Sequence, residues 1–179
     1  MRRIVVLGTS GSGKTTLAST LARRLRIPHI EMDAIHWKPN WTSSTTQEML
    51  PIVDERTSQP GWVLDGNYRA MRELVWSRAD TIIWLDYSMR VVFTRVFIRT
   101  MRRCWGRERL WAGNRESLVL QFCNRESILL WVITTWRIRR RDYPAELRTE
   151  AAKGKRILRF RSPEHCDAWL ANLNHDCEP

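Results

Sequence analysis

The stretch Gly8-Thr9-Ser10-Gly11-Ser12-Gly13-Lys14-Thr15 decides the fold of this chain. It fits the P-loop pattern, in which two glycines with four residues between them are followed by lysine and threonine. Glycines let backbone N–H groups turn inward around a phosphate, and the helix that follows directs its positive N-terminal end at the same anion. The pattern predicts that Lys14 reaches the β- and γ-phosphates of a nucleotide and that the Thr15 hydroxyl holds Mg²⁺. The residues expected to contact the nucleotide here are Gly8, Ser10, Gly11, Ser12, Gly13, Lys14, Thr15 and Thr16.

The sequence around this loop has the strand-to-helix context that the pattern requires. Residues 4–7 form an apolar, β-branched run typical of a buried parallel strand, and residues 14–26 carry apolar side chains at helical spacing before Pro28. Further predicted strands alternate with predicted helices and lie at 29–32, 62–64, 81–85 and 156–160. The alternation predicts an α/β fold of the P-loop NTPase type, with a five-stranded parallel sheet and helices on both faces.

Three of the predicted strands end at an aspartate, namely Asp33, Asp65 and Asp86. In parallel sheets of this kind, ligands bind beyond the carboxyl ends of the strands. We therefore expect the three carboxylates to gather near the glycine loop.

Several helix starts can also be read from the sequence. Thr45 and Glu48 have the spacing of a capping box, which would require Pro51 to lie in the first turn. Ser88 is a predicted N-cap, and Ser162 is a second one, followed by proline at the first helical position.

Length and composition limit the classes of protein that need to be considered. The chain has 179 residues, the size of one domain, so 1–179 is predicted to form a single unit. The longest uncharged apolar stretch, 127–136, is shorter than the roughly 20 residues of a membrane-spanning helix, and no signal-peptide core precedes the first strand. A cytoplasmic protein without membrane contact is expected. The four cysteines form no CxxC pair, which argues against a zinc knuckle or a disulfide framework.

The charge balance indicates an anionic partner. Lysine and arginine number 30 against 19 acidic residues, and nearly all of the basic residues are arginine. Because the guanidinium group contacts phosphate through two parallel hydrogen bonds, this composition suits nucleotides or nucleic acid. A general preference of the genome for arginine over lysine would also account for the arginines that are scattered along the chain.

The segment Asp65-Gly66-Asn67-Tyr68, directly after a predicted strand, resembles the adenylate-kinase-like nucleotide and small-molecule kinases. That resemblance implies that Asp65 orients the Mg²⁺ shell together with Thr15. It also places Asn67 and Tyr68 on the substrate side. Where the family continues with Phe-Pro-Arg, this chain has Asn67-Tyr68-Arg69, so the arginine that contacts a nucleoside monophosphate falls on Arg69 or Arg72.

The resemblance is closer to a subgroup described as DNA topology modulation proteins, or adenylate-kinase-related kinases, and it covers almost the whole chain. The matching segments are 29–33, His36-Trp37, Trp41, 65–68, Leu110-Trp111, 113–116 and 127–131. The name of the subgroup implies an effect on DNA, whereas its motifs imply a kinase, and the motifs carry more weight.

Residues 34–60 are predicted to form the acceptor-binding insertion. Asp33 either accepts a proton from an acceptor hydroxyl or orients the acceptor through hydrogen bonds. Adenylate kinases usually carry Thr-Gly-Asp here, so a carboxylate at this position favours a hydroxyl or nucleoside-like acceptor over a phosphate. His36, Trp37 and Trp41 are predicted to line the acceptor pocket, where their rings can stack on a base or sugar ring.

The remaining candidates are arginines. Arg95 and Arg99 match the R-x-x-x-R pattern of adenylate-kinase-like enzymes, which implies that Arg95 packs on adenine and Arg99 contacts the transferred phosphate. Residues 104–116 are predicted to be a short arginine-rich lid, with Arg115 and Arg125 closing over the γ-phosphate. Arg161, after the last strand, lies where such kinases pass backbone beside adenine.

These features together predict an ATP- and Mg²⁺-dependent phosphotransferase acting on a small-molecule acceptor, which is a nucleotide, a nucleoside or another small compound. The alternative is a nucleic-acid-binding regulatory NTPase, in which the basic residues behind the +11 net charge bind a DNA or RNA backbone. The arginine-rich stretch 137–141 would serve that alternative, or it is a solvated helix end favoured by the helix dipole. A nucleotide-binding domain without activity is the third reading.

Overall fold

The computed structural model describes residues 1–105, 110–114 and 128–173. Its five strands are all parallel and lie in the order β2-β3-β1-β4-β5. The strands are β1 (Arg3–Gly8), β2 (His29–Glu31), β3 (Trp62–Asp65), β4 (Thr81–Leu85) and β5 (Arg156–Phe160). The predicted five-stranded parallel sheet is therefore confirmed, with every strand limit predicted to within one residue.

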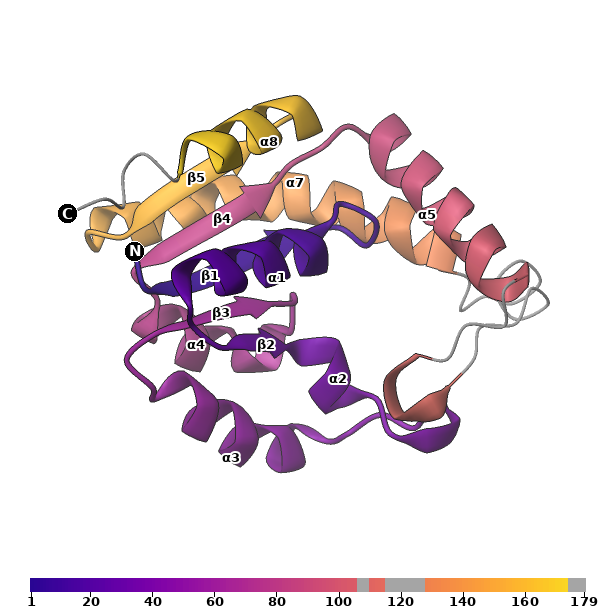
Figure 1. Cartoon of the computed structure of the whole chain (residues 1–179), viewed down its shortest axis with the longest axis horizontal. Coiled ribbons are helices and arrows are strands. Elements are labelled where there is room, and N and C mark those ends of the chain that lie inside the picture. Colours follow the sequence, from indigo (N-terminus) through magenta and orange to yellow (C-terminus); the bar gives the residue numbers. More distant parts are fainter. Residues whose placement is uncertain (106–109, 115–127, 174–179) are drawn as a thin grey trace.

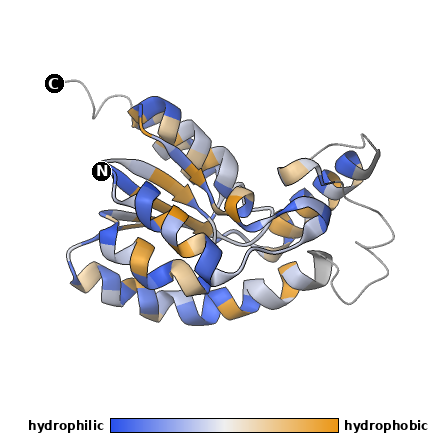
Figure 2. Cartoon of the chain, turned by 90° about the horizontal axis from the view of Figure 1, so that it is seen from below, coloured by the Kyte–Doolittle hydropathy of each residue, from blue (hydrophilic) through white to orange (hydrophobic). Residues whose placement is uncertain are grey.

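Helices cover both faces of this sheet (Figure 1). They are α1 (Lys14–Leu25), α2 (Met32–His36), α3 (Thr46–Thr57), α4 (Arg72–Arg78), α5 (Met89–Trp105), α7 (Ile128–Ala152) and α8 (Pro163–Asn172), with single 3₁₀ turns η1 (Pro39–Trp41), η2 (Arg69–Met71) and η3 (Trp111–Gly113). Side chains along β1 alternate between the two faces. Ile4 and Val6 pack against α1, α5 and α8, whereas Val5 and Leu7 pack against α3, α4 and the second half of α7. In Figure 2 the hydrophobic residues of the strands appear in orange.

The predicted helix starts are confirmed at three positions. Thr45 and Glu48 form the full capping box of α3. Ser162 accepts a hydrogen bond from the backbone of His165, and Ser88 accepts one from Val91 at 3.5 Å. The expectation that Pro51 lies in the first turn is wrong, because Pro51 is inside α3. It occupies an exposed position, where water can reach the carbonyl that lacks its usual N–H donor.

Two other expectations are corrected. The second strand ends at Glu31, and Met32–His36 forms α2, so Asp33 lies in the first turn of a helix rather than at the end of a strand. The helix predicted to end near 141 continues to Ala152, because Tyr143 and Leu147 keep an apolar face packed on the sheet. The arginine-rich stretch 137–141 therefore lies within α7 and is not a helix end.

Within the described residues, no helix combines the length and the hydrophobicity that crossing a membrane would need.

Candidate active site

The P-loop joins β1 to α1 and packs tightly against α5. Gly11 and Gly13 have φ angles of 83° and 91°, which favour glycine. A Cβ atom on Gly11 would lie 2.3 Å from Cγ2 of Val96 and 2.9 Å from the carbonyl oxygen of Val92. The loop therefore needs glycine at this position for two reasons, its backbone conformation and its contact with α5.

Lys14 folds back over the loop, and its Nζ donates to the carbonyl oxygen of Thr9 at 3.3 Å. Burial lowers the pKa of Lys14 to about 8, against the effect of Asp33 and Asp65, which raise it. Arg139 and Arg99 lower the pKa of Lys14 further. The charge of the lysine is thus influenced by carboxylates from the first turn of α2 and the end of β3 and by guanidinium groups from α5 and α7.

The predicted metal pair comes together in the structure. Thr15 Oγ1 donates to Asp65 Oδ2 at 2.5 Å, and His29 Nε2 lies 2.9 Å from the other carboxylate oxygen. Among the described residues, no three His, Cys, Asp or Glu side chains are grouped to hold a metal ion by themselves. One carboxylate and one hydroxyl are nevertheless the kind of donor set that Mg²⁺ uses when waters and substrate phosphates supply its other ligands. The residues present therefore fit a Mg²⁺ ion that arrives with a nucleotide.

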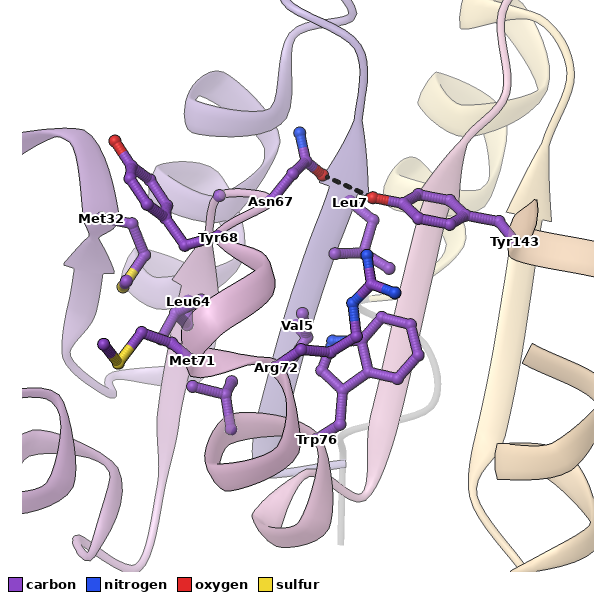
Figure 3. Close-up of a pocket in the computed structure, with 12 residues that line it drawn as sticks. Val5, Leu7, Met32, Leu64, Asn67, Tyr68, Met71, Arg72, Trp76 and Tyr143 are labelled. Atoms are coloured by element: carbon purple, nitrogen blue, oxygen red, sulfur yellow. Dashed lines mark hydrogen bonds between the residues drawn. The ribbon is translucent and has the colours of Figure 1, made fainter. Parts of the chain in front are cut away.

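Asn67 connects the end of β3 to the start of the P-loop. Its Nδ2 donates to the carbonyl oxygen of Gly8 at 2.6 Å, and its Oδ1 accepts from the backbone N–H of Gly8 at 3.2 Å. The Tyr143 hydroxyl donates to the same Oδ1 at 3.3 Å (Figure 3). Asn67 was predicted on the substrate side, but its polar atoms are directed to the loop backbone.

The predicted acceptor residues lie together beyond the end of β2. The Tyr68 hydroxyl donates to Asp33 Oδ1 at 2.7 Å. The His36 ring centroid lies 4.6 Å from that of Trp37 and 4.9 Å from that of Tyr68, and Trp37 contacts Trp41 edge-on at 5.3 Å. We call His36, Trp37, Trp41 and Tyr68 the aromatic cluster.

Two members of the aromatic cluster are held in their neutral forms. Burial, with a further contribution from Asp33, raises the pKa of Tyr68. Burial lowers the pKa of His36, although Asp33 opposes the shift. At neutral pH, Tyr68 therefore keeps its proton and donates it in a hydrogen bond to Asp33, and His36 carries no positive charge.

Glu31 is a further carboxylate at this end of the site. Burial, followed by the charge of Asp65, raises its pKa, and a hydrogen bond from the Trp111 indole opposes that rise. In the sequence, Glu31 stands out only as part of the segment 29–33. Its position at the end of a predicted strand that neighbours the strand ending at Asp65 was the available signal, because neighbouring parallel strands bring their carboxyl ends together.

The two predicted arginines of α5 contact the P-loop. Arg95 Nη1 donates to the carbonyl oxygen of Ser12 at 3.5 Å, and Arg99 Nη2 donates to Ser10 Oγ at 3.2 Å. Arg95 also lines a cavity of about 370 Å³ on the outer side of the loop, together with Thr16, Tyr87 and Pro163. This cavity lies where an adenine was predicted. Arg161 is exposed and does not line it.

Arg139, on α7, is a candidate that the sequence analysis missed. Burial lowers its pKa, and a hydrogen bond with Tyr143 opposes the shift. Its charge also acts on Lys14. No signal in the sequence sets Arg139 apart from its neighbouring arginines, because which face of α7 meets the site depends on where the helix lies on the sheet.

Arg72 takes a different position from the predicted acceptor contact. It forms an ion pair with Glu146 at 2.6 Å, and its guanidinium carbon lies 4.9 Å from the Trp76 ring centroid. It lines a cavity of about 20 Å³ on the α4 face of the sheet, room for about one water molecule (Figure 3). Its charge is thus already balanced within the fold.

Asp86 does not join the other carboxylates. Its buried side chain pairs with Arg140 at 3.0 Å and with Arg159 at 2.6 Å, so it links α7 and β5 to the end of β4. The predicted gathering at the glycine loop holds for Asp33 and Asp65 and is wrong for Asp86. Arg115 and Arg125 lie outside the described residues, as do residues 106–109 and 116 of the predicted lid.

Comparisons with known proteins were made for the whole chain. No protein-family model matches it. An uncharacterized protein of Bacillus subtilis (strain 168), YqaC, is 25% identical over 116 residues, which are 64% of this chain and 65% of that protein. The match therefore spans slightly less than two thirds of that relative's length.

Three solved structures are similar to this chain. A shikimate kinase from Bacteroides thetaiotaomicron has a TM-score of 0.60 at 17% identity and covers 99% of each chain. A gluconokinase from Sinorhizobium meliloti 1021 has a TM-score of 0.52 at 21% identity, covering 98% of this chain and 94% of its own. An unliganded sugar kinase from Janibacter sp. HTCC2649 has a TM-score of 0.52 at 19% identity, covering 100% of this chain and 96% of its own. The chain therefore has the fold of the P-loop kinases.

The resemblance to DNA topology modulation proteins is not addressed by these comparisons and stays a prediction.

Proposed function

We propose that this protein is an ATP- and Mg²⁺-dependent kinase that transfers the γ-phosphoryl group to a hydroxyl of a small-molecule acceptor. The observation that carries the proposal is the position of Asp33. It raises the pKa of Lys14 against the effect of burial, and it accepts a hydrogen bond at 2.7 Å from Tyr68, a member of the aromatic cluster. Support for the class of reaction also comes from the fold shared with small-molecule kinases.

The charges of the site favour a hydroxyl over a phosphate as the acceptor group. Three carboxylates lie close together here, and the charges of Asp65 and Asp33 add to the effect of burial in raising the pKa of Glu31. A phosphate acceptor would add negative charge beside these carboxylates, whereas a hydroxyl group adds none. The cations Lys14, Arg99 and Arg139 lie on the other side, where the migrating phosphoryl group would be.

The proposed step is an in-line transfer. The acceptor hydroxyl oxygen forms a new bond to the γ-phosphorus while the bond to the β–γ bridging oxygen breaks, and ADP leaves with that electron pair. Asp33 takes the hydroxyl proton on Oδ2, since Oδ1 already accepts from Tyr68. Lys14 and Arg99 balance the charge on the phosphoryl oxygens. Bound Mg²⁺, held by Thr15 and Asp65, would neutralise the β- and γ-phosphates.

A phosphoryl-transfer screen tests the proposal. ATP with Mg²⁺ is offered to gluconate, shikimate, nucleosides, nucleoside monophosphates and small alcohols, and phosphorylated product is detected by mass spectrometry. We expect product from a hydroxyl acceptor, its loss in Lys14→Ala, and a rate roughly 100-fold lower in Asp33→Asn. Glu55→Gln, an exposed substitution on α3, and Lys153→Ala serve as matched controls.

Two results would contradict the proposal. Exclusive phosphorylation of nucleoside monophosphates would show a phosphate acceptor, and a fully active Asp33→Asn would remove the proton acceptor. Hydrolysis of ATP that rises only with duplex or single-stranded DNA, and binding that weakens steeply with salt, would favour the regulatory NTPase instead.

A further inference from the structure

The segment Leu110–Asn114 docks onto the loop that follows α2 (Figure 1). Asn114 is buried, and its side chain spans the loop. Its Oδ1 accepts from the backbone N–H of Trp41 at 3.0 Å, and its Nδ2 donates to the carbonyl oxygen of Lys38 at 2.9 Å. One amide thus satisfies two backbone groups that lie 73 and 76 residues away in sequence.

Both partners of this contact hold unusual backbone conformations. Asn40 and Trp41 on one side have φ angles of 59° and 55°, and Ala112 on the other has 52°. Arg26 is the one other non-glycine residue with positive φ in the described parts of the chain. Left-handed conformations of this kind are costly for residues with a side chain and persist where surrounding contacts hold them. The two segments are therefore shaped by being docked together.

The docked contact connects the two ends of the proposed site. In sequence, residues 110–114 follow α5, whose Arg95 and Arg99 contact the P-loop, and precede α7, which carries Arg139. The loop on the other side carries the tryptophans of the aromatic cluster, next to Asp33. A second link is the hydrogen bond of Trp111 to Glu31, which joins the docked segment to the end of β2 beside Asp65.

We propose that Asn114 is a positioning residue that couples nucleotide binding to the acceptor end of the site, by holding the loop 37–44 in its docked conformation. This inference rests on the proposed function. The docked segment contacts the nucleotide end of the site through Trp111, which hydrogen-bonds Glu31 beside Asp65, and it holds the backbone of Lys38 and Trp41 through Asn114. A nucleotide bound with Mg²⁺ at Thr15 and Asp65 would therefore restrain the docked segment and, through Asn114, the loop. By linkage, a bound acceptor strengthens nucleotide binding by the same factor.

Amide hydrogen exchange measured with the full chain, with and without the nonhydrolysable analogue AMP-PNP and Mg²⁺, tests the coupling. In the wild type we expect the analogue to slow exchange in residues 8–15, which it contacts, and also in residues 37–44, which it does not. In Asn114→Ala we expect exchange in 37–44 to be about tenfold faster, with no response to AMP-PNP there, while protection of 8–15 persists. A substitution that merely loosened the whole fold would weaken both regions together.

Asn114→Asp is the second variant, because it keeps the size of the side chain and the acceptor for Trp41 while placing a carboxylate oxygen against the Lys38 carbonyl. It should also abolish the response of 37–44. Asn172→Ala, exposed on α8, is the matched control and should behave as the wild type. A response of 37–44 that survives in both Asn114 variants, or that is absent from the wild type, overturns the coupling. Absence of protection at 8–15 in the wild type overturns the proposed function and this inference with it.

Discussion

Asn67 and Gly8 form a closed pair, in which one side-chain amide bonds both backbone groups of the first P-loop glycine at 2.6 and 3.2 Å. Since β1 and β3 are neighbours in the sheet, the pair ties the start of the loop to the turn that follows Asp65. A change in Asn67 should therefore reach the nucleotide through the loop, without any contact of its own.

Asn67→Ala is expected to lower the free energy of unfolding by about 1–3 kcal/mol, because it leaves the part-buried Gly8 N–H and carbonyl without their partner. Nucleotide affinity should fall by roughly tenfold, because the loop that carries Lys14 is less firmly placed. Urea denaturation and titration with AMP-PNP measure the two effects. Wild-type affinity in this variant would show that the loop keeps its shape unaided.

Gly11→Ala should destabilise the protein more than Gly154→Ala. Both glycines have positive φ, 83° and 86°, so both substitutions carry the same conformational cost of about 1 kcal/mol. At Gly154 nothing lies within 4 Å of the added Cβ, whereas at Gly11 the Cβ meets Val96 at 2.3 Å. The difference between the two melting temperatures isolates the steric clash.

Val96→Ala in the Gly11→Ala background should recover part of that difference, because it removes the methyl group that the new Cβ meets. It should not recover all of it, since the Val92 carbonyl oxygen remains 2.9 Å away. Equal melting temperatures of Gly11→Ala and Gly154→Ala would mean that the loop moves away from α5 at little cost.

The elements that could be predicted from sequence are those whose signals are local. The P-loop, the apolar strands and the Thr45, Ser88 and Ser162 caps depend on residues within a few positions of one another, and the structure confirms them. Thr15 and Asp65 were also predicted to act together, Thr15 from the P-loop pattern and Asp65 from the resemblance to adenylate-kinase-like kinases, and their side chains meet in the structure.

The missed features depend on contacts between distant segments. Whether an arginine of 137–141 faces solvent or the site follows from where α7 lies on the sheet, so Arg139 and Arg140 could not be told apart from Arg137 by spacing alone. Asn114 was quoted only as part of a motif, since nothing in its neighbourhood indicates the Lys38 carbonyl as its partner.

Asp86→Asn is expected to lower the free energy of unfolding by about 3 kcal/mol. The carboxylate is buried and faces Arg140 and Arg159 together, so removal of its charge leaves two guanidinium groups without a counter-ion. Asp54→Asn, which breaks the more exposed pair with Arg78, should cost under about 1 kcal/mol. Chemical denaturation of both variants measures the two losses in free energy of unfolding. Similar losses would contradict a stabilising role of the buried Asp86 ion pairs.

Lys14 should make both stability and activity depend on pH in opposite directions. Burial lowers its pKa in the folded protein to about 8, below the value of 10.5 for an unburied lysine, so the unfolded chain binds the proton more tightly. The free energy of unfolding should therefore rise as pH increases from about 8 to 10.5, whereas kcat/KM for ATP should fall above pH 8 as the free enzyme loses the charge.

Lys14→Met should be more stable than the wild type at pH 7 by about 1–3 kcal/mol, because it removes the cost of the buried charge, and this advantage should shrink as pH rises toward 10.5. Urea denaturation at pH 7 and pH 10 measures the stability effect in both proteins. A stability difference between Lys14→Met and the wild type that stays constant with pH would show that the lysine is charged at no cost in the folded protein, held by Asp33 and Asp65.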